Sequence, residues 1–110
     1  MAKYVVVPVP VDDTVLVRWD LSEADAKGEA YPLPAYRFAS VQAGLCAGIV
    51  EWHGSLTPDG GVGSLLHDTF GAPAMLGSCE LKTLAENVYR MGPEFTGDGE
   101  VTAYLLIRRL

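Results

Sequence analysis

Apolar residues fill two short stretches at the start of the chain, and the pattern predicts a β-hairpin over residues 4–19. The arms are residues 4–11 and 14–19, and the acidic pair Asp12-Asp13 separates them. Strand-forming β-branched and aromatic residues dominate both arms, and two polar residues between such runs are typical of a tight turn. We therefore expect antiparallel arms joined at the aspartates.

Two prolines in the first arm decide which kind of strand it forms. Pro8 and Pro10 are two residues apart, so their missing N–H groups belong to the same edge of the strand. A two-residue loop would place Val7 opposite Arg18 and both prolines at non-bonded positions. Proline has no N–H to donate, so the pattern predicts an edge strand with both prolines facing outward. A polyproline-like segment is the alternative.

The hairpin is apolar on both of its faces. One face carries Tyr4, Val6, Pro8, Pro10, Val15, Val17 and Trp19. The other carries Val5, Val7, Val9, Val11, Thr14, Leu16 and Arg18. A small domain has core enough to cover only one of them. We therefore expect helices or another chain to cover the second face.

The middle of the chain gives weaker signals. A short helix is predicted at 23–27, followed by an extended segment at 31–36 that its prolines hold open. Residues 40–52 are compatible with either a helix or a strand, and the β-branched end of this segment favours a strand near 46–52. A long, ordered, glycine-rich loop is expected over 53–77.

The last third predicts one helix and one strand. Residues 79–91 place apolar side chains at helical spacing, with Ser78 as the cap and Gly92-Pro93 as the stop. After a turn at 97–99, residues 100–109 form a strand that is apolar on both faces, as central strands are. We expect this strand to pair with the N-terminal hairpin.

Together these elements predict a single α+β domain spanning residues 1–110. Its parts are an antiparallel sheet, one principal helix and an ordered loop: hairpin 4–19, strand 46–52, loop 53–77, helix 79–91 and strand 100–109.

Charge and composition exclude some classes of function. Apolar residues make up 49 % of the chain, and the net charge is −6, with a pI near 4.7. A binder of nucleic acid or of an anionic membrane needs a basic surface, so neither partner is expected. The first residues do not resemble a signal peptide, which favours a cytoplasmic or virion location. In such a location, Cys46 and Cys79 are expected to be free and buried.

Residues capable of chemistry are few and scattered. His67-Asp68 resembles a metal-hydrolase dipeptide but lacks the further ligands that such a site needs. The set Cys46, His53, His67 and Cys79 lacks the close pairs of a structural zinc site. Cys79 at a helix start is a candidate reactive thiol. We predict no catalytic, cofactor-binding or metal-binding residue and no cofactor.

Three functions remain. The first is a non-enzymatic structural or interaction protein, a subunit of a larger protein assembly such as a virion or phage-assembly component. The second is a small acidic inhibitor or adaptor that docks on a basic surface of a host enzyme or complex. The third is a small enzyme that uses His53, His67 and Asp68, or Cys79. For the first, the apolar candidates for contact with a protein partner are Val5, Val7, Val9, Leu16, Leu56, Val62, Leu65 and Phe70.

Overall fold

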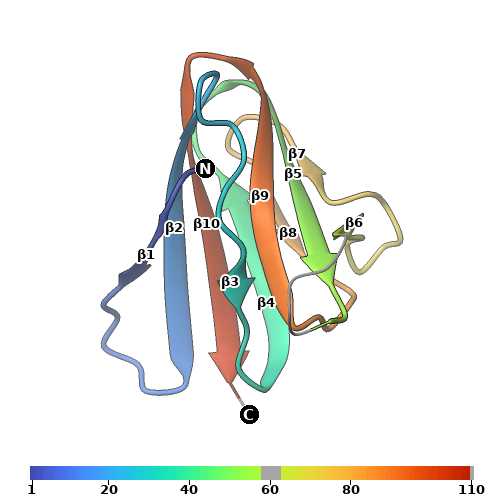
Figure 1. Ribbon diagram of the computed structural model, residues 1–110. Helices are drawn as coiled ribbons and strands as arrows, with labels where there is room; N and C mark the ends of the chain where they lie inside the picture. Colours follow the sequence, from blue (N-terminus) through green and yellow to red (C-terminus); the bar gives the residue numbers. More distant parts are fainter. Residues whose placement is uncertain (58–62, 110) are drawn as a thin grey trace.

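The protein folds as two antiparallel five-stranded sheets that pack face to face (Figure 1). The computed structural model describes residues 1–57 and 63–109. The first sheet has the order β1-β2-β10-β4-β8, and the second has the order β3-β9-β5-β6, with β7 also paired to β5. In Figure 1, β9 and β3 run in front of β10 and β4. The strands are β1 (Tyr4–Val7), β2 (Thr14–Ser22), β3 (Tyr31–Pro32), β4 (Tyr36–Ala43), β5 (Ala47–Ser55), β6 (Ser64–Leu65), β7 (Met75–Leu76), β8 (Leu81–Thr83), β9 (Arg90–Asp98) and β10 (Glu100–Arg109).

The fold is all-β, so the expected α+β class is wrong, and so is the helix at 79–91. Residues 81–83 pair with β4 instead, and residues 90–98 form the long strand β9. Leu84, Val88 and Met91 are buried as the helical spacing suggested, but they reach the core from a connection and a strand. Pairing with strands distant in the sequence has overridden the local helical preference.

Tyr36 anchors the connection that replaces this helix. The Val88 N–H donates to the Tyr36 hydroxyl at 2.8 Å, and that hydroxyl lies 3.4 Å from the Glu86 carbonyl oxygen. Burial of the ring raises the pKa of the Tyr36 phenol above its ordinary value. The hydroxyl therefore remains a neutral partner for the Val88 amide, which is itself buried.

The N-terminal hairpin and its edge strand are confirmed, but the strand ends at Val7, before both prolines. Its register also differs from the expected one by two residues. Val7 lies opposite Leu16, and Arg18 lies opposite Val5. The turn at Asp12-Asp13 closes through a 3.2 Å bond from Thr14 N to Val11 O. Between the turn and the Val7–Leu16 pair, the first arm has two residues more than the second, and residues 8–10, which include both prolines, lie outside the strand. A shift of two keeps every side chain on its expected face.

Of the other predicted elements of secondary structure, some are confirmed and some are wrong. The C-terminal strand and its pairing with the hairpin are confirmed, because β10 lies between β2 and β4. Within residues 40–52, residues 40–43 belong to β4 and residues 47–52 belong to β5, with 44–46 connecting the two strands. The short helix at 23–27 is wrong, since Ser22 Oγ accepts from Asp25 N at 3.1 Å in a non-helical turn. The expected loop 53–77 contains the end of β5 and the strands β6 and β7.

Two tryptophans occupy the centre of the core. Trp19 on β2 and Trp52 on β5 are fully buried, and their rings meet edge to face at 5.5 Å and 77°. Alternate residues of β10 complete the first layer of the core: Val101, Ala103, Leu105 and Ile107. These four residues share one face of the strand, as its alternation predicts.

A crossing segment, residues 26–29, lies before β3 and links the two sheets along one side. Gly28 N donates to Pro93 O of β9 at 2.8 Å, while Ala2 N donates to Lys27 O at 2.9 Å. The segment therefore bonds to the N-terminus on one side and to the second sheet on the other. A Cβ on Gly28 would lie 2.7 Å from both Trp19 Cδ1 and Pro93 Cδ. Only glycine fits at this crossing without moving the core.

We predict that Gly28→Val destabilises the protein by about 1–3 kcal/mol, because the added carbons collide with a core that cannot relax freely. Chemical denaturation measures the change. Gly63→Ala is the control, since a Cβ there meets its nearest neighbour at an ordinary 3.6 Å. Equal stability of the two variants would contradict a tight crossing at Gly28.

We also predict that Tyr36→Phe costs about 1–3 kcal/mol, because the Val88 N–H is left buried without a partner. Tyr104→Phe is the control, since Tyr104 lies on the partly exposed outer face of β10 and should change stability by less than about 0.5 kcal/mol. The same denaturation experiment compares them, and a neutral Tyr36→Phe would argue against the anchoring role of this hydroxyl.

Candidate functional site

The outer face of the first sheet carries a band of apolar side chains that polar residues interrupt in one of its rows. In one row across the sheet, Leu16 stands between Val7 and Leu106. In the next row, Arg18 lies between Val5 and Tyr104. Gln42 lies between Tyr104 and Leu81, which is at the β8 end. Because strand side chains alternate, burying one face of β2 and β10 leaves this second face outside. We call it the apolar band: Val5, Val7, Leu16, Leu81, Tyr104 and Leu106.

The apolar band is hollowed into a groove between β2, β10, β4 and β8. The groove has a volume of about 450 Å³ and is lined by Leu16, Ser40, Val41, Gln42, Leu81, Tyr104 and Leu106. Ser40 Oγ lies 3.3 Å from Thr83 Oγ1, so this hydroxyl is already partnered within the sheet. No charged side chain belongs to the lining among the described residues. The groove is therefore better suited to binding an apolar group than to catalysing a reaction.

One ion pair includes Arg18, which lies within the apolar band, and another lies beside the band. Arg18 Nε lies 3.8 Å from Asp20 Oδ1, and Arg108 Nη1 lies 3.9 Å from Asp13 Oδ2. Both pairs are long and partly exposed, so each contributes little to stability. Charges at the rim of an apolar surface affect the orientation and rate of association more than its affinity.

The residues predicted to contact a partner separate into two groups. Val5, Val7 and Leu16 come together in the apolar band. Val9 lies beyond the end of β1, in the hairpin connection. The other described candidates are on or near the β6 side of the second sheet: Leu56, Leu65 and Phe70. Phe70 is the most exposed of these, at 96 %. Val62 lies outside the described residues.

Three members of the apolar band were not among the candidates. Tyr104 and Leu106 had a visible signal, because β10 alternates with apolar residues on both faces. Leu81 had none, since the helical spacing of 79–91 assigned it to the inside of a helix. It is instead 63 % exposed on the edge strand β8.

His67 and Asp68 hold neighbouring loops together. Glu86 accepts from the His67 main-chain N–H at 2.7 Å, and its other oxygen lies 2.8 Å from His67 Nδ1. Burial alone would raise the pKa of Glu86, but the contacts with His67 outweigh it and lower that pKa. Likewise, burial would raise the pKa of Asp68, but Lys82 and two main-chain N–H groups hold it below its ordinary value. These partners account for both side chains structurally.

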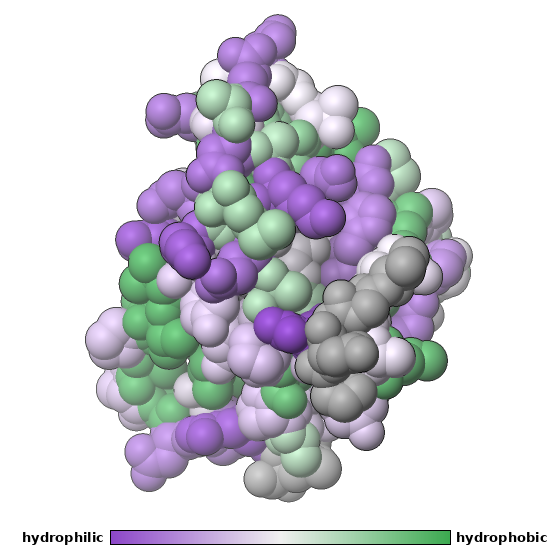
Figure 2. Space-filling view, in the orientation of Figure 1, coloured by the Kyte–Doolittle hydropathy of each residue, from purple (hydrophilic) through white to green (hydrophobic). Residues whose placement is uncertain are grey.

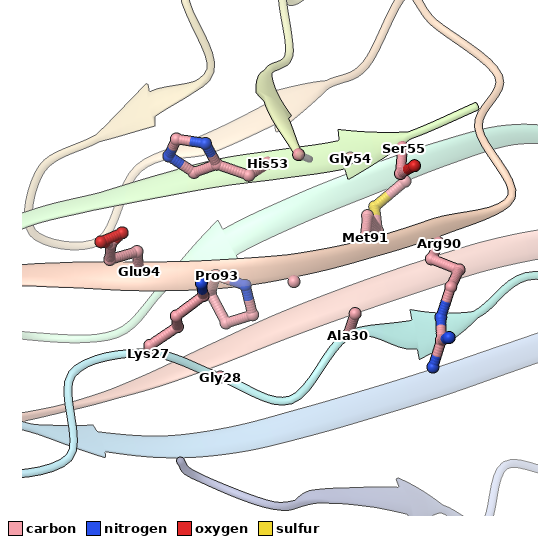
Figure 3. Close-up of a pocket in the computed structure, with 12 residues that line it drawn as sticks. Lys27, Gly28, Ala30, His53, Gly54, Ser55, Arg90, Met91, Pro93 and Glu94 are labelled. Carbon is pink, nitrogen blue, oxygen red and sulfur yellow. The ribbon is translucent and has the colours of Figure 1, made fainter. Parts of the chain in front are cut away.

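His53 lines a small pocket on the second sheet, and neither His67 nor Asp68 belongs to the lining of that pocket. The pocket, about 170 Å³, lies between β5, β9 and the crossing segment, and Figure 3 shows His53 and Arg90 toward opposite ends of it. His53 Nε2 is 3.1 Å from Glu51 Oε1. Ser55, which also lines the pocket, has its hydroxyl 2.8 Å from Thr57 Oγ1. Neither contact forms a serine–histidine pair of the kind that activates a nucleophile.

The two cysteines are free, but neither is buried as expected: Cys46 is partly exposed and Cys79 is exposed. Cys79 lies in a turn with φ of +62°, rather than at a helix start. Within residues 1–57 and 63–109, no three His, Cys, Asp or Glu side chains come together as a metal site would require.

The outer face of the second sheet differs in character from the apolar band. Figure 2 looks onto this face and shows hydrophilic residues over its centre, with hydrophobic residues gathered at the left margin over the β1–β2 hairpin. In the described part of the chain, no helix has the length and hydropathy to cross a membrane.

Comparison with known proteins places the fold but not a family. No protein-family model matches the sequence, and no curated protein matches it either. Among solved structures, the chain is similar to the one titled "Crystal structure of SPBc2 prophage-derived protein YomS", with a TM-score of 0.61 and 13 % identity over 91 % of this chain and 98 % of that one. At that identity the likeness is one of fold. The chain thus shares its all-β architecture, over nearly its full length, with a prophage-derived protein.

Proposed function

We propose that this protein is a non-enzymatic subunit of a larger protein assembly, of the kind found in a phage particle or in its assembly intermediates. The observation that carries the proposal is the apolar band on the first sheet. The six members of the band are apolar or aromatic, and they lie on strands of one sheet. No helix in the described residues covers them. Large exposed apolar patches typically mark sites of protein interaction.

The size and chemistry of the apolar band fit a protein contact. Fully burying an exposed Val, Leu or similar side chain is worth about 1.5–3 kcal/mol. Of the six members of the band, Val5 and Leu81 are exposed and the other four are partly exposed, so these four would contribute less each. A stable interface covers about 800 Å² on each partner, which a five-stranded sheet face can supply. The fold likeness to a prophage-derived protein supports a phage context, and such a subunit would occur in the host cytoplasm and in the virion.

We predict that the wild-type protein self-associates at micromolar concentration and that Leu106→Glu returns it to a monomer, because the carboxylate would be buried in the contact without a partner. Sedimentation velocity over a range of protein and salt concentrations measures this. Thr96→Glu, on the exposed outer side of β9, adds the same charge to the other sheet and should associate like the wild type.

Two results would contradict this proposal. One is a monodisperse monomer at every concentration and salt level. The other is equal loss of association in both variants, which would point to net charge rather than to the apolar band. Circular dichroism of each variant establishes that it remains folded, and Leu81→Glu repeats the test at a position that is already 63 % exposed.

A further inference from the structure

The loop between β6 and β7 is built around one buried carboxylate. Asp68 is 6 % exposed, and its Oδ1 accepts from Phe70 N at 2.9 Å and from Ala72 N at 3.0 Å. Its Oδ2 lies 3.1 Å from Lys82 Nζ. Gly71 N also donates to the Asp68 carbonyl, and Gly71 has φ of +86°. The loop therefore has one fixed shape, set by hydrogen bonds to Asp68.

The same loop is fastened to the body of the protein on both sides. Thr69 N donates to Thr83 O of β8 at 3.0 Å. His67 binds Glu86 through both its main-chain N–H and its ring. Figure 1 shows the segment between β6 and β7 projecting from the sandwich at the right of the view. It is thus an ordered projection.

Phe70 stands at the tip of this projection and is 96 % exposed. Its own main-chain N–H is one of the groups that Asp68 holds, so the position of its Cα is fixed. An aromatic side chain buries about 150–250 Å² when it docks. Because the loop is ordered before binding, little conformational entropy remains to be lost on docking. A single exposed aromatic on a rigid support is typical of an interface anchor.

The same chain offers an apolar groove that would accept such a side chain. The groove of the apolar band is lined mostly by aliphatic and aromatic carbon, and Leu81 forms its β8 side. The charges beside the two features are opposite in sign: Glu86, which also contacts His67, flanks the loop. Arg18, which also contacts Asp20, lies beside Tyr104 in register. If the grooves of two copies packed against each other, Phe70 would remain in solvent. Insertion of Phe70 into the groove of another copy would cover both the ring and the groove.

We propose that Phe70 of one copy inserts into the groove of a second copy of this chain. This proposal rests on the proposed function and names its first partner. The contact joins two different surfaces, so it either closes reciprocally into a pair or continues into a ring or filament. The area beyond Phe70 comes from the rest of the apolar band, since one aromatic alone is far below the area of a stable interface.

The test compares two single variants with their equimolar mixture by sedimentation velocity. Phe70→Ser removes the inserted ring, and Leu81→Glu places a charge in the groove. Each should weaken self-association by at least about 30-fold, the loss expected for an interface anchor. Both residues are exposed, so circular dichroism of each variant should show the wild-type fold. Tyr89→Ser removes another exposed aromatic and should leave association unchanged.

The mixture gives the decisive result. Phe70→Ser still offers an intact groove and Leu81→Glu still offers an intact Phe70, so the two together should form a complex that neither forms alone. A mixture that stays monomeric would show that the ring and the groove do not meet. If Phe70→Ser associates like the wild type while Leu81→Glu does not, the groove packs without the loop, which overturns this contact and leaves the proposed function standing.

Discussion

The packing of Trp19 against Trp52 decides which face of each sheet is inside. The two indoles meet at 5.5 Å from opposite sheets, and the period of two along a strand then assigns every neighbour to the core or to solvent. On β10 this sends Ala103 and Leu105 inward, while Tyr104 and Leu106 remain outside. The apolar band is thus a direct consequence of the core: the chain has more apolar strand surface than one sandwich can bury.

The sequence predicted those elements whose local pattern and long-range pairing agree. Residues 100–109 alternate cleanly and lie between two partners, and the hairpin turn at Asp12-Asp13 closes as expected. The hairpin register could not be predicted, because it depends on how many residues near Pro8 and Pro10 stay unpaired. The shift by two still left the assignment of faces correct, since only an odd shift exchanges them.

The helix at 79–91 failed for the opposite reason. Its apolar spacing is real, but the partners that decide its structure lie far away in sequence: β4 pairs with residues 81–83, and β5 pairs with β9. The Tyr36 hydroxyl, which holds Val88 in the connection between them, is likewise far away along the chain. No pattern within 79–91 contains this information. The error also hid Leu81, so the groove could not be assembled from the sequence although Leu16, Tyr104 and Leu106 were in view.

The edges of the sheets explain why association should use a face and a loop. An uncovered edge strand invites pairing with another chain. Here β1 has only four residues and leads directly into Pro8, and the β8 edge is bonded by Thr69. In the second sheet, β3, β6 and β7 have two residues each. With strand addition disfavoured at each of these edges, the surfaces that remain for a specific contact are the apolar band and the projection that carries Phe70. Association through these surfaces joins side chains rather than main chains, so its strength depends on a few residues that single substitutions can remove.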